Sequence, residues 1–474
     1  MKDTVRAGIF GIGLDTYWPQ FEGLKERLEG YQRRISQEIE TAGNVELVDA
    51  GLVDTPDRAH EVAATFAREQ VSIIFLYIST YALSSTVLPV AQKTGVPIVV
   101  LNIQPVAAIE YETFNRLGDR GKMTGEWLAH CQACCVPEIA SIFNRTGIEY
   151  QLVTGYLGEE RTHDEIVGWV DAARVAHTMR NNRLGVMGHY YAGMLDVYTD
   201  ISRQIGAFGG HVDLIEIDEL AELRSGVTKS ETQKKLAEFQ SAFEVSPECD
   251  DVELDRAART SVAFDKLIEN HRLGSLAYYY EGSAGSPHED IVTSVIAGNT
   301  LLTGRNVPVA GECEIKNAQA MKIIDSFGAG GSFSEFYAMD FTDDIVLLGH
   351  DGPAHFAIAE GSVALVPVPV YHGKPGKGLS IQMTVKHGPV TLLSVCEGPN
   401  GVYLIVAEGE SIPGPVLQIG NTNSRYRFPL PARDFIERWA RLGPSHHCAI
   451  GVGHIADRIE KLGALLGLPV TRVC

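Results

Sequence analysis

The sequence VAGECEIKNAQAMKIIDSFGAGGSFSEFYAMDFTDDIVLLGHDGPAHFA, residues 309 to 357, marks the point where the chain changes from one structural pattern to another. Upstream, apolar strand-like runs alternate with helical patterns, and from about Gly328 the chain consists of short β-like runs bounded by turns. The same stretch holds Glu312 at a glycine turn, Glu335 just past a glycine cluster, and His350 at the end of an apolar run. We expect these three side chains at turns or strand ends, where a fold presents side chains to a cleft.

A fourth nitrogen ligand is available much later in the chain, from His446 or His447. Two carboxylates and two imidazoles form a mixed donor set that suits manganese, cobalt or iron better than a thiolate-bound structural zinc. A site of this kind would be catalytic. The spacing matches no short metal signature, and the alternative interpretation is that these residues are surface glutamates and helix-capping histidines.

Four motifs in this part of the chain resemble the L-arabinose isomerase family, a branch of the L-fucose/L-arabinose isomerase group. The family's GEGD, GGTSFMED, LGSH and AGGAHH are similar to residues 311–314 (GECE), 330–335 (GGSFSE), 347–350 (LLGH) and 443–447 (GPSHH). The resemblance implies that Glu312, Glu335, His350 and His447 bind one divalent ion, Mn²⁺ or another such as Co²⁺ or Fe²⁺. It also implies a homo-oligomer, a trimer, tetramer or hexamer.

The chemistry that the resemblance implies is the conversion of a small aldose into a ketose. Moving a carbonyl from C1 to C2 takes a proton from one carbon and delivers it to the next through a cis-enediol, so Glu312 and Glu335 would serve as the acid/base pair. A divalent ion would stabilise the charge that develops on the two oxygens. Two alternatives remain open at this point, a non-enzymatic sugar-binding protein and a metal-dependent epimerase or lyase that uses the same site.

Several other residues are candidates for binding the substrate. Tyr17 and Trp18 lie on a loop after the first predicted strand, where they could stack on a sugar or merely fasten the loop to its domain. Met194 and Tyr280 resemble substrate-contacting positions of the family, and His446 precedes the candidate ligand His447.

Two departures from the family pattern concern the substrate rather than the metal. The glutamate of the family's HMLEVCP is absent from residues 350–353 (HDGP), and the histidine of its NQTAHG is absent from residues 115–120 (NRLGDR). A site that hydrogen-bonds a particular hydroxyl discriminates strongly between sugars. We therefore expect a best substrate other than L-arabinose.

The composition of the chain indicates which binding partners and which cellular location to expect. The formal net charge of −20 argues against nucleic acid or an anionic membrane surface, because neutralising phosphates requires clustered Lys and Arg. No window approaches about 18 uninterrupted apolar residues, so no membrane span is expected. No signal sequence is visible after Lys2 and Asp3, and the eight cysteines are scattered, which favours a cytoplasmic protein with reduced thiols. Cys131, Cys134 and Cys135 form a CxxCC group on a predicted helix that begins near Lys122.

The 474 residues predict an α/β fold of three domains. Residues 1–180 and 181–327 each form a doubly wound parallel-sheet domain, and residues 328–474 form a mainly antiparallel β domain, a barrel or sandwich with closing helices. The predicted strands of the first two domains are Val5 to Phe10, Val45 to Leu52, Val71 to Ile78, Val96 to Ile103, Leu184 to Met187, Val212 to Ile217, Leu276 to Tyr280 and Val307 to Ala310.

In the third domain the predicted strands are Ser362 to Val370, Leu379 to Val385, Val390 to Cys396 and Tyr403 to Glu408. The predicted helices include Thr228 to Phe243, Leu254 to Asn270 and Ala432 to Arg441, and the pair His446-His447 is predicted to lie on a loop.

Overall fold

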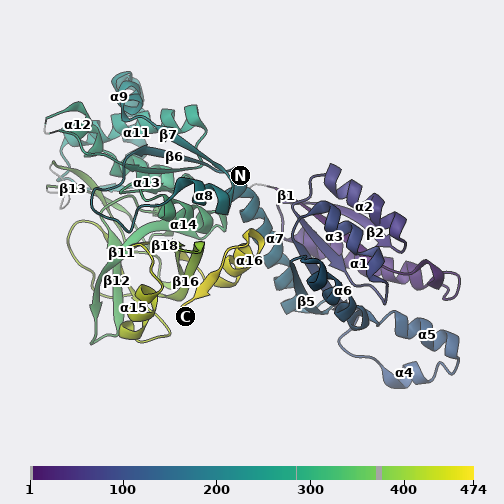
Figure 1. Cartoon of the computed structure of the whole chain (residues 1–474). Helices are drawn as coiled ribbons and strands as arrows, with labels where there is room; N and C mark the ends of the chain where they lie inside the picture. Colours follow the sequence, from purple (N-terminus) through teal and green to yellow (C-terminus); the bar gives the residue numbers. More distant parts are fainter. Residues whose placement is uncertain (1–3, 284, 370–375) are drawn as a thin grey trace. The chain divides into compact units, whose positions relative to one another are not determined.

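The computed structural model describes residues 4–283, 285–369 and 376–474. It separates the chain into two compact units, Met1–His177 and Thr178–Cys474 (Figure 1). The predicted boundary at residue 327 falls inside the second unit, and the three-domain division stays a prediction. Within the described residues, no helix combines the length and the apolar content that crossing a membrane requires.

The first unit is built on a five-stranded parallel sheet with the strand order β2-β1-β3-β4-β5. Its central strand β3 (Ile73–Tyr77) is buried along its whole length, as expected for a parallel sheet covered by helices on both faces. This confirms the doubly wound prediction. The other strands are β1 (Val5–Ile12), β2 (Val45–Val53), β4 (Ile98–Gln104) and β5 (Tyr150–Tyr156).

Two helices of the first unit can be compared with the sequence. Thr55 caps α2 (Pro56–Arg68) by accepting the Arg58 N–H at 3.2 Å. The sequence predicts one helix that begins near Lys122 and carries the CxxCC group. The structure has two helices there: α5 (Arg120–Leu128) ends before Cys131, which is the N-cap residue of α6 (Gln132–Thr146). The remaining helices are α1 (Leu24–Thr41), α3 (Leu88–Thr94), α4 (Tyr111–Asn115) and α7 (Glu160–Asn181), the last of which runs into the second unit.

The second unit opens with another parallel sheet, ordered β10-β9-β6-β7. Its strands are β6 (Arg183–Gly188), β7 (His211–Ile215), β9 (Ser275–Tyr279) and β10 (Val309–Ala310). Ile217, predicted as a strand end, instead begins α9 (Ile217–Ser225). The two predicted helices are present as α10 (Lys229–Ala242), with a capping box between Thr228 and Glu231, and α11 (Asp251–His271). Shorter helices are α8 (Ile201–Phe208), α12 (Pro287–Val292) and α13 (Ile296–Thr303).

The rest of the second unit contains a closed antiparallel barrel. Each of six strands pairs with two others, in the order β15-β18-β11-β12-β17-β16 and back to β15. Closure leaves these strands without a free edge. They are β11 (Gly330–Asp340), β12 (Ile345–His350), β15 (Gly388–Gly398), β16 (Gly401–Ile412), β17 (Thr422–Arg427) and β18 (His447–Val452), with β19 (Val470–Arg472) added in parallel to β16.

Smaller elements surround this barrel. β13 (Ala364–Val368) and β14 (Gly378–Gln382) form a second small sheet with β8 (Glu244–Val245), and Val370, the predicted end of β13, lies outside the described residues. The helices α15 (Ala432–Arg441) and α16 (Ala456–Leu466) follow, the first with the predicted bounds.

Helix α14 (Ile315–Ser326) lies between the parallel sheet and the barrel, and all of its residues are buried. It packs against β9 and β10 of the sheet and against β11, β15 and β18 of the barrel (Figure 1). A helix buried all round has no solvent face, so its polar residues need internal partners, such as the Asn306 carbonyl that accepts from Lys322 Nζ at 2.8 Å. The helix therefore joins the two sheets rigidly.

Gly331, at the start of β11, lies against α14 at a position that leaves no room for a side chain. Its φ is +107°, and a Cβ there would lie 2.6 Å from the carbonyl oxygen of Met321 in α14. We predict that Gly331→Ala lowers the free energy of unfolding by roughly 2 to 5 kcal/mol, from left-handed backbone strain plus the clash.

Gly361 provides the matched control, because its φ is +73° and the space around it is open. Gly361→Ala should cost only the backbone strain, about 1 to 2 kcal/mol. Chemical denaturation of both variants measures the difference, and equal losses would contradict close packing at Gly331.

Candidate functional site

Glu312 is positioned by an unusual turn between β10 and α14. Glu312 and Cys313 both have φ of +56°, a left-handed conformation that is uncommon away from glycine. The turn is held by hydrogen bonds from the Cys313 N–H to the Tyr278 carbonyl and from the Glu314 N–H to the Gly311 carbonyl, both 3.0 Å long. Strained backbone persists only where its surroundings fix it, and it is concentrated at functional sites.

The barrel supplies three more candidate ligands from three adjacent strands. Glu335 of β11 stands opposite His447 of β18 on one side and opposite Gly349 of β12 on the other. His350 is the last residue of β12, one residue beyond Gly349. Two details differ from the sequence prediction. Glu335 lies inside a long strand rather than at a turn or strand end, and His447 begins a strand rather than lying on a loop, because both residues are hydrogen-bonded into the barrel.

The side chains of these residues converge. Ligand atoms of Glu312, His350 and His447 lie within 4.8 Å of one another, and so do those of Glu335, His446 and His447. His447 belongs to both groups and is fully buried. The four predicted metal ligands and His446 therefore form one cluster in the second unit.

The hydrogen bonding of His447 leaves one nitrogen for another ligand. Nδ1 is hydrogen-bonded to the Glu314 carboxylate, which can only accept, so Nδ1 carries the proton and Nε2 has a free lone pair. Nε2 lies 3.5 Å from Glu312 Oε2, and both atoms are buried without a hydrogen-bond partner within the described part of the chain. Two buried electron-pair donors that face each other fit a metal cation between them.

The charges of the cluster shift two pKa values. Burial raises the pKa of Glu335, and the nearby carboxylates of Glu312 and Asp351 act in the same direction, against His446 and His447. Burial lowers the pKa of His446, but the carboxylates of Glu312 and Asp196 outweigh it and raise the value to about 9. The site thus brings the carboxyl groups of Glu312 and Glu335 together beside the imidazoles, an arrangement suited to acid/base chemistry.

The predicted substrate-binding residues occupy different environments. Met194 is partly buried on the loop after β6, two residues before Asp196. Tyr280 is buried in the core of the second unit with its ring edge-on to His288. In the first unit, Trp18 Nε1 donates to Asp54 Oδ2 at 2.8 Å, and Tyr17 packs near it. Binding of substrate by these four residues stays a prediction.

Two residues of the site were absent from the sequence prediction. Glu314 orients His447, and the available signal was its place as the last residue of the motif at 311–314. Asp196 binds His446 from a loop 250 residues away in the sequence, and no local pattern identifies such a pair.

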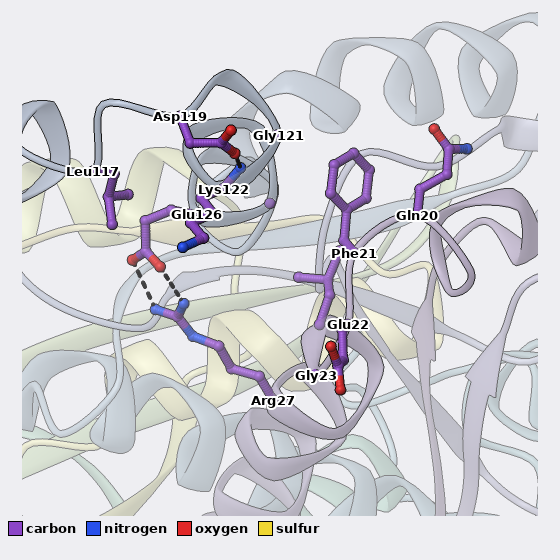
Figure 2. A pocket seen from close by; sticks show the side chains of 12 residues that line it. Gln20, Phe21, Glu22, Gly23, Arg27, Leu117, Asp119, Gly121, Lys122 and Glu126 are labelled. Atoms are coloured by element: carbon purple, nitrogen blue, oxygen red, sulfur yellow. Dashed lines mark hydrogen bonds and ion pairs between the residues drawn. The ribbon is translucent and has the colours of Figure 1, made fainter.

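The first unit has a pocket of its own, about 590 Å³ in volume, beside the loop that follows β1 (Figure 2). Arg27 and Glu126 form two hydrogen bonds across one side of it, at 2.6 and 3.1 Å. Phe21 and Lys122 also line it. The end of a parallel strand is a common place for ligands, but none of the clustered candidate ligands lines this pocket.

Comparison with known proteins gives relatives of two kinds. No family model matches the chain. A sulfoquinovose isomerase of Alkalicoccus urumqiensis is 22% identical over 307 residues, which cover 62% of this chain and 66% of that protein. An L-arabinose isomerase of a Nocardioides species is 24% identical, with 70% of this chain and 68% of that protein covered. The L-arabinose isomerase of Bacillus subtilis is 26% identical over 45% of this chain and 44% of its own. A solved structure, Salmonella D-lactate dehydrogenase, has a TM-score of 0.14 at 12% identity, which supports no argument.

The Glu314–His447 hydrogen bond yields a test of metal binding. Glu314→Gln removes the charge that orients His447, and such changes typically lower metal affinity by about 10- to 100-fold. We expect this loss when Mn²⁺ is titrated calorimetrically into chelator-treated protein.

The matched control is Glu219→Gln, since Glu219 also binds a histidine, His271, at 2.9 Å but away from the cluster. Its affinity for Mn²⁺ should equal that of the unchanged protein. Equal affinities for all three proteins would contradict a metal ligand at His447.

Proposed function

We propose that this chain, a divergent member of the isomerase group that includes sulfoquinovose isomerase and L-arabinose isomerase, is a metal-dependent aldose–ketose isomerase acting on a small sugar. The observation that carries the proposal is the pair of buried atoms Glu312 Oε2 and His447 Nε2, which lie 3.5 Å apart without a hydrogen bond among the described residues, with Glu335 in the same cluster. The homo-oligomer implied by the resemblance remains a proposal as well.

The metal would be held by Glu312, Glu335, His350 and His447. Their two oxygens and two nitrogens form a donor set that suits Mn²⁺, Co²⁺ or Fe²⁺, and we propose Mn²⁺. When bound, a divalent ion supplies positive charge where negative charge develops on the substrate's oxygens.

The two glutamates would transfer the proton between C1 and C2. They approach from different elements, Glu312 from the turn before α14 and Glu335 from β11 after it, so α14 fixes their separation. One carboxylate would remove the proton from C2 of the aldose while the other carboxyl group protonates O1, which gives the cis-enediol. The first would then deliver its proton to C1 while the second takes the proton from O2, which gives the ketose.

A non-enzymatic sugar-binding protein would need neither the second carboxylate nor the strained turn that presents the first. A metal-dependent epimerase or lyase could use the same residues, because an enediol leads to more than one product. Analysis of the products formed from aldoses separates these outcomes from isomerisation.

We predict that Glu312→Gln and Glu335→Gln each leave the protein folded but lower kcat by about 10²- to 10⁴-fold or more, since each removes a proton-transfer group and a metal ligand together. Ketose formation in the presence of Mn²⁺ is the measurement, with circular dichroism to check folding. Glu281→Gln, a carboxylate that accepts from Tyr279 at 2.8 Å outside the ligand cluster, tests for nonspecific loss of charge. Full activity of a Glu312/Glu335 double variant would refute the proposed mechanism.

A further prediction concerns which sugar is the best substrate. Asp351 stands directly after His350, and residues 115–120 lack a histidine, so the hydroxyl groups of the substrate meet different partners from those of the L-arabinose enzymes. We expect the highest kcat/KM for an aldose other than L-arabinose, such as another pentose or a 6-deoxyhexose. An aldose panel with Mn²⁺ measures this, and a clear preference for L-arabinose would show that other residues replace the missing ones.

A further inference from the structure

The loop after β6 reaches the candidate site through Asp196. The carboxylate atom Oδ2 accepts two hydrogen bonds from His446, one from the backbone N–H at 3.0 Å and one from Nδ1 at 2.6 Å. The backbone carbonyl of Asp196 separately accepts from Ser445 Oγ at 3.1 Å and from Lys316 Nζ. The loop is therefore anchored by its backbone, and the carboxylate is a second, independent contact.

This carboxylate determines how the imidazole of His446 is presented. Because a carboxylate only accepts hydrogen bonds, Nδ1 must be the protonated nitrogen, and the ring cannot turn without losing the contact. Nε2 is then directed at Glu312 Oε2, 3.5 Å away. The ring also packs on His447, with the ring centroids 3.9 Å apart.

The exposure of the two histidines differs sharply. The side chain of His446 is 35% exposed, whereas that of His447 is 0% exposed. His446 is therefore the more accessible of the two histidines, and its Nε2, 3.5 Å from Glu312 Oε2, is an atom that an oxygen of an entering sugar could reach. A sugar hydroxyl both donates and accepts, so it can bond this nitrogen whether or not Nε2 carries a proton.

We propose that Asp196 is a positioning residue for substrate, which fixes His446 so that Nε2 hydrogen-bonds a sugar hydroxyl beside Glu312. The proposal rests on the proposed function and adds to it the residue and the atom that would orient the sugar. It also gives the loop after β6 a second residue with a role in recognition, beside Met194, the predicted substrate contact on that loop.

The test compares Asp196→Leu and Asp196→Asn, with Asp200→Asn as the control. Asp200 is a carboxylate on the same loop whose contacts cap α8 away from the cluster. For each Mn²⁺-loaded protein, we would measure KM and kcat for the best aldose, calorimetric binding of the matching unreactive alditol, and affinity for Mn²⁺.

Asp196→Leu should weaken alditol binding and raise KM by about 10- to 100-fold, the usual effect of removing a partner that orients a histidine. Affinity for Mn²⁺ should be unchanged. Asp196→Asn should recover most of the loss, since its amide oxygen still accepts from His446. In a His446→Leu background, Asp196→Leu should have no further effect, because it acts through that ring.

Two results would overturn the proposal. Alditol binding by Asp196→Leu equal to that of Asp200→Asn would show that the contact is only structural. A loss of Mn²⁺ affinity in Asp196→Leu would make His446 a metal ligand, which its place in the Glu335 group permits. An unchanged protein that neither isomerises any aldose nor binds any alditol would instead refute the proposed function itself, and this inference with it.

Discussion

The architecture of the site depends on His447, an imidazole buried between two carboxylates. Glu314 holds one ring nitrogen, and the other faces Glu312 Oε2 at 3.5 Å without a hydrogen bond. Leaving a buried polar atom unpaired typically costs about 1 to 3 kcal/mol, so the fold must compensate elsewhere for two of them. Both atoms gain a partner if a cation lies between them. That gain is the physical reason for proposing a metal at this position.

Helix α14 is the element that maintains this arrangement. The strained turn of Glu312 leads into it, β11 with Glu335 follows it, and its buried Lys316 binds the backbone of the loop that carries Asp196. Because α14 packs on the parallel sheet and on the barrel, no part of the site can shift without disturbing one of them. Glu312, in the turn before α14, and Glu335, in β11 after it, thus have a fixed separation.

The relatives and the geometry support the same class of chemistry by independent routes. Two kinds of sugar isomerase are similar to this chain at 20–26% identity, which is low enough for the substrate to differ. The candidate ligands lie in the motifs that carry the resemblance, whereas Asp351 and Asp196 lie outside them. Asp351 adds negative charge near Glu335. Residues around a shared reaction centre are where specificity for the rest of a substrate is expected.

Much of the secondary structure and the candidate ligands could be predicted from the sequence alone. Continuous apolar runs such as β3 predicted buried parallel strands, and Thr55 and Thr228 marked helix starts, because periodicity and capping are interactions between neighbours in the chain. Short motifs likewise identified Glu312 and His447 as candidates.

How these residues meet depends on the packing of the whole second unit. The pairing of Glu335 with His447 follows from the register of β11 on β18, and closure of the barrel makes His447 part of a strand instead of a loop. The contact between Asp196 and His446 joins residues 250 positions apart. Register, closure and contacts of this range are fixed by packing the whole unit together, and a single stretch of sequence contains no local interaction that specifies them.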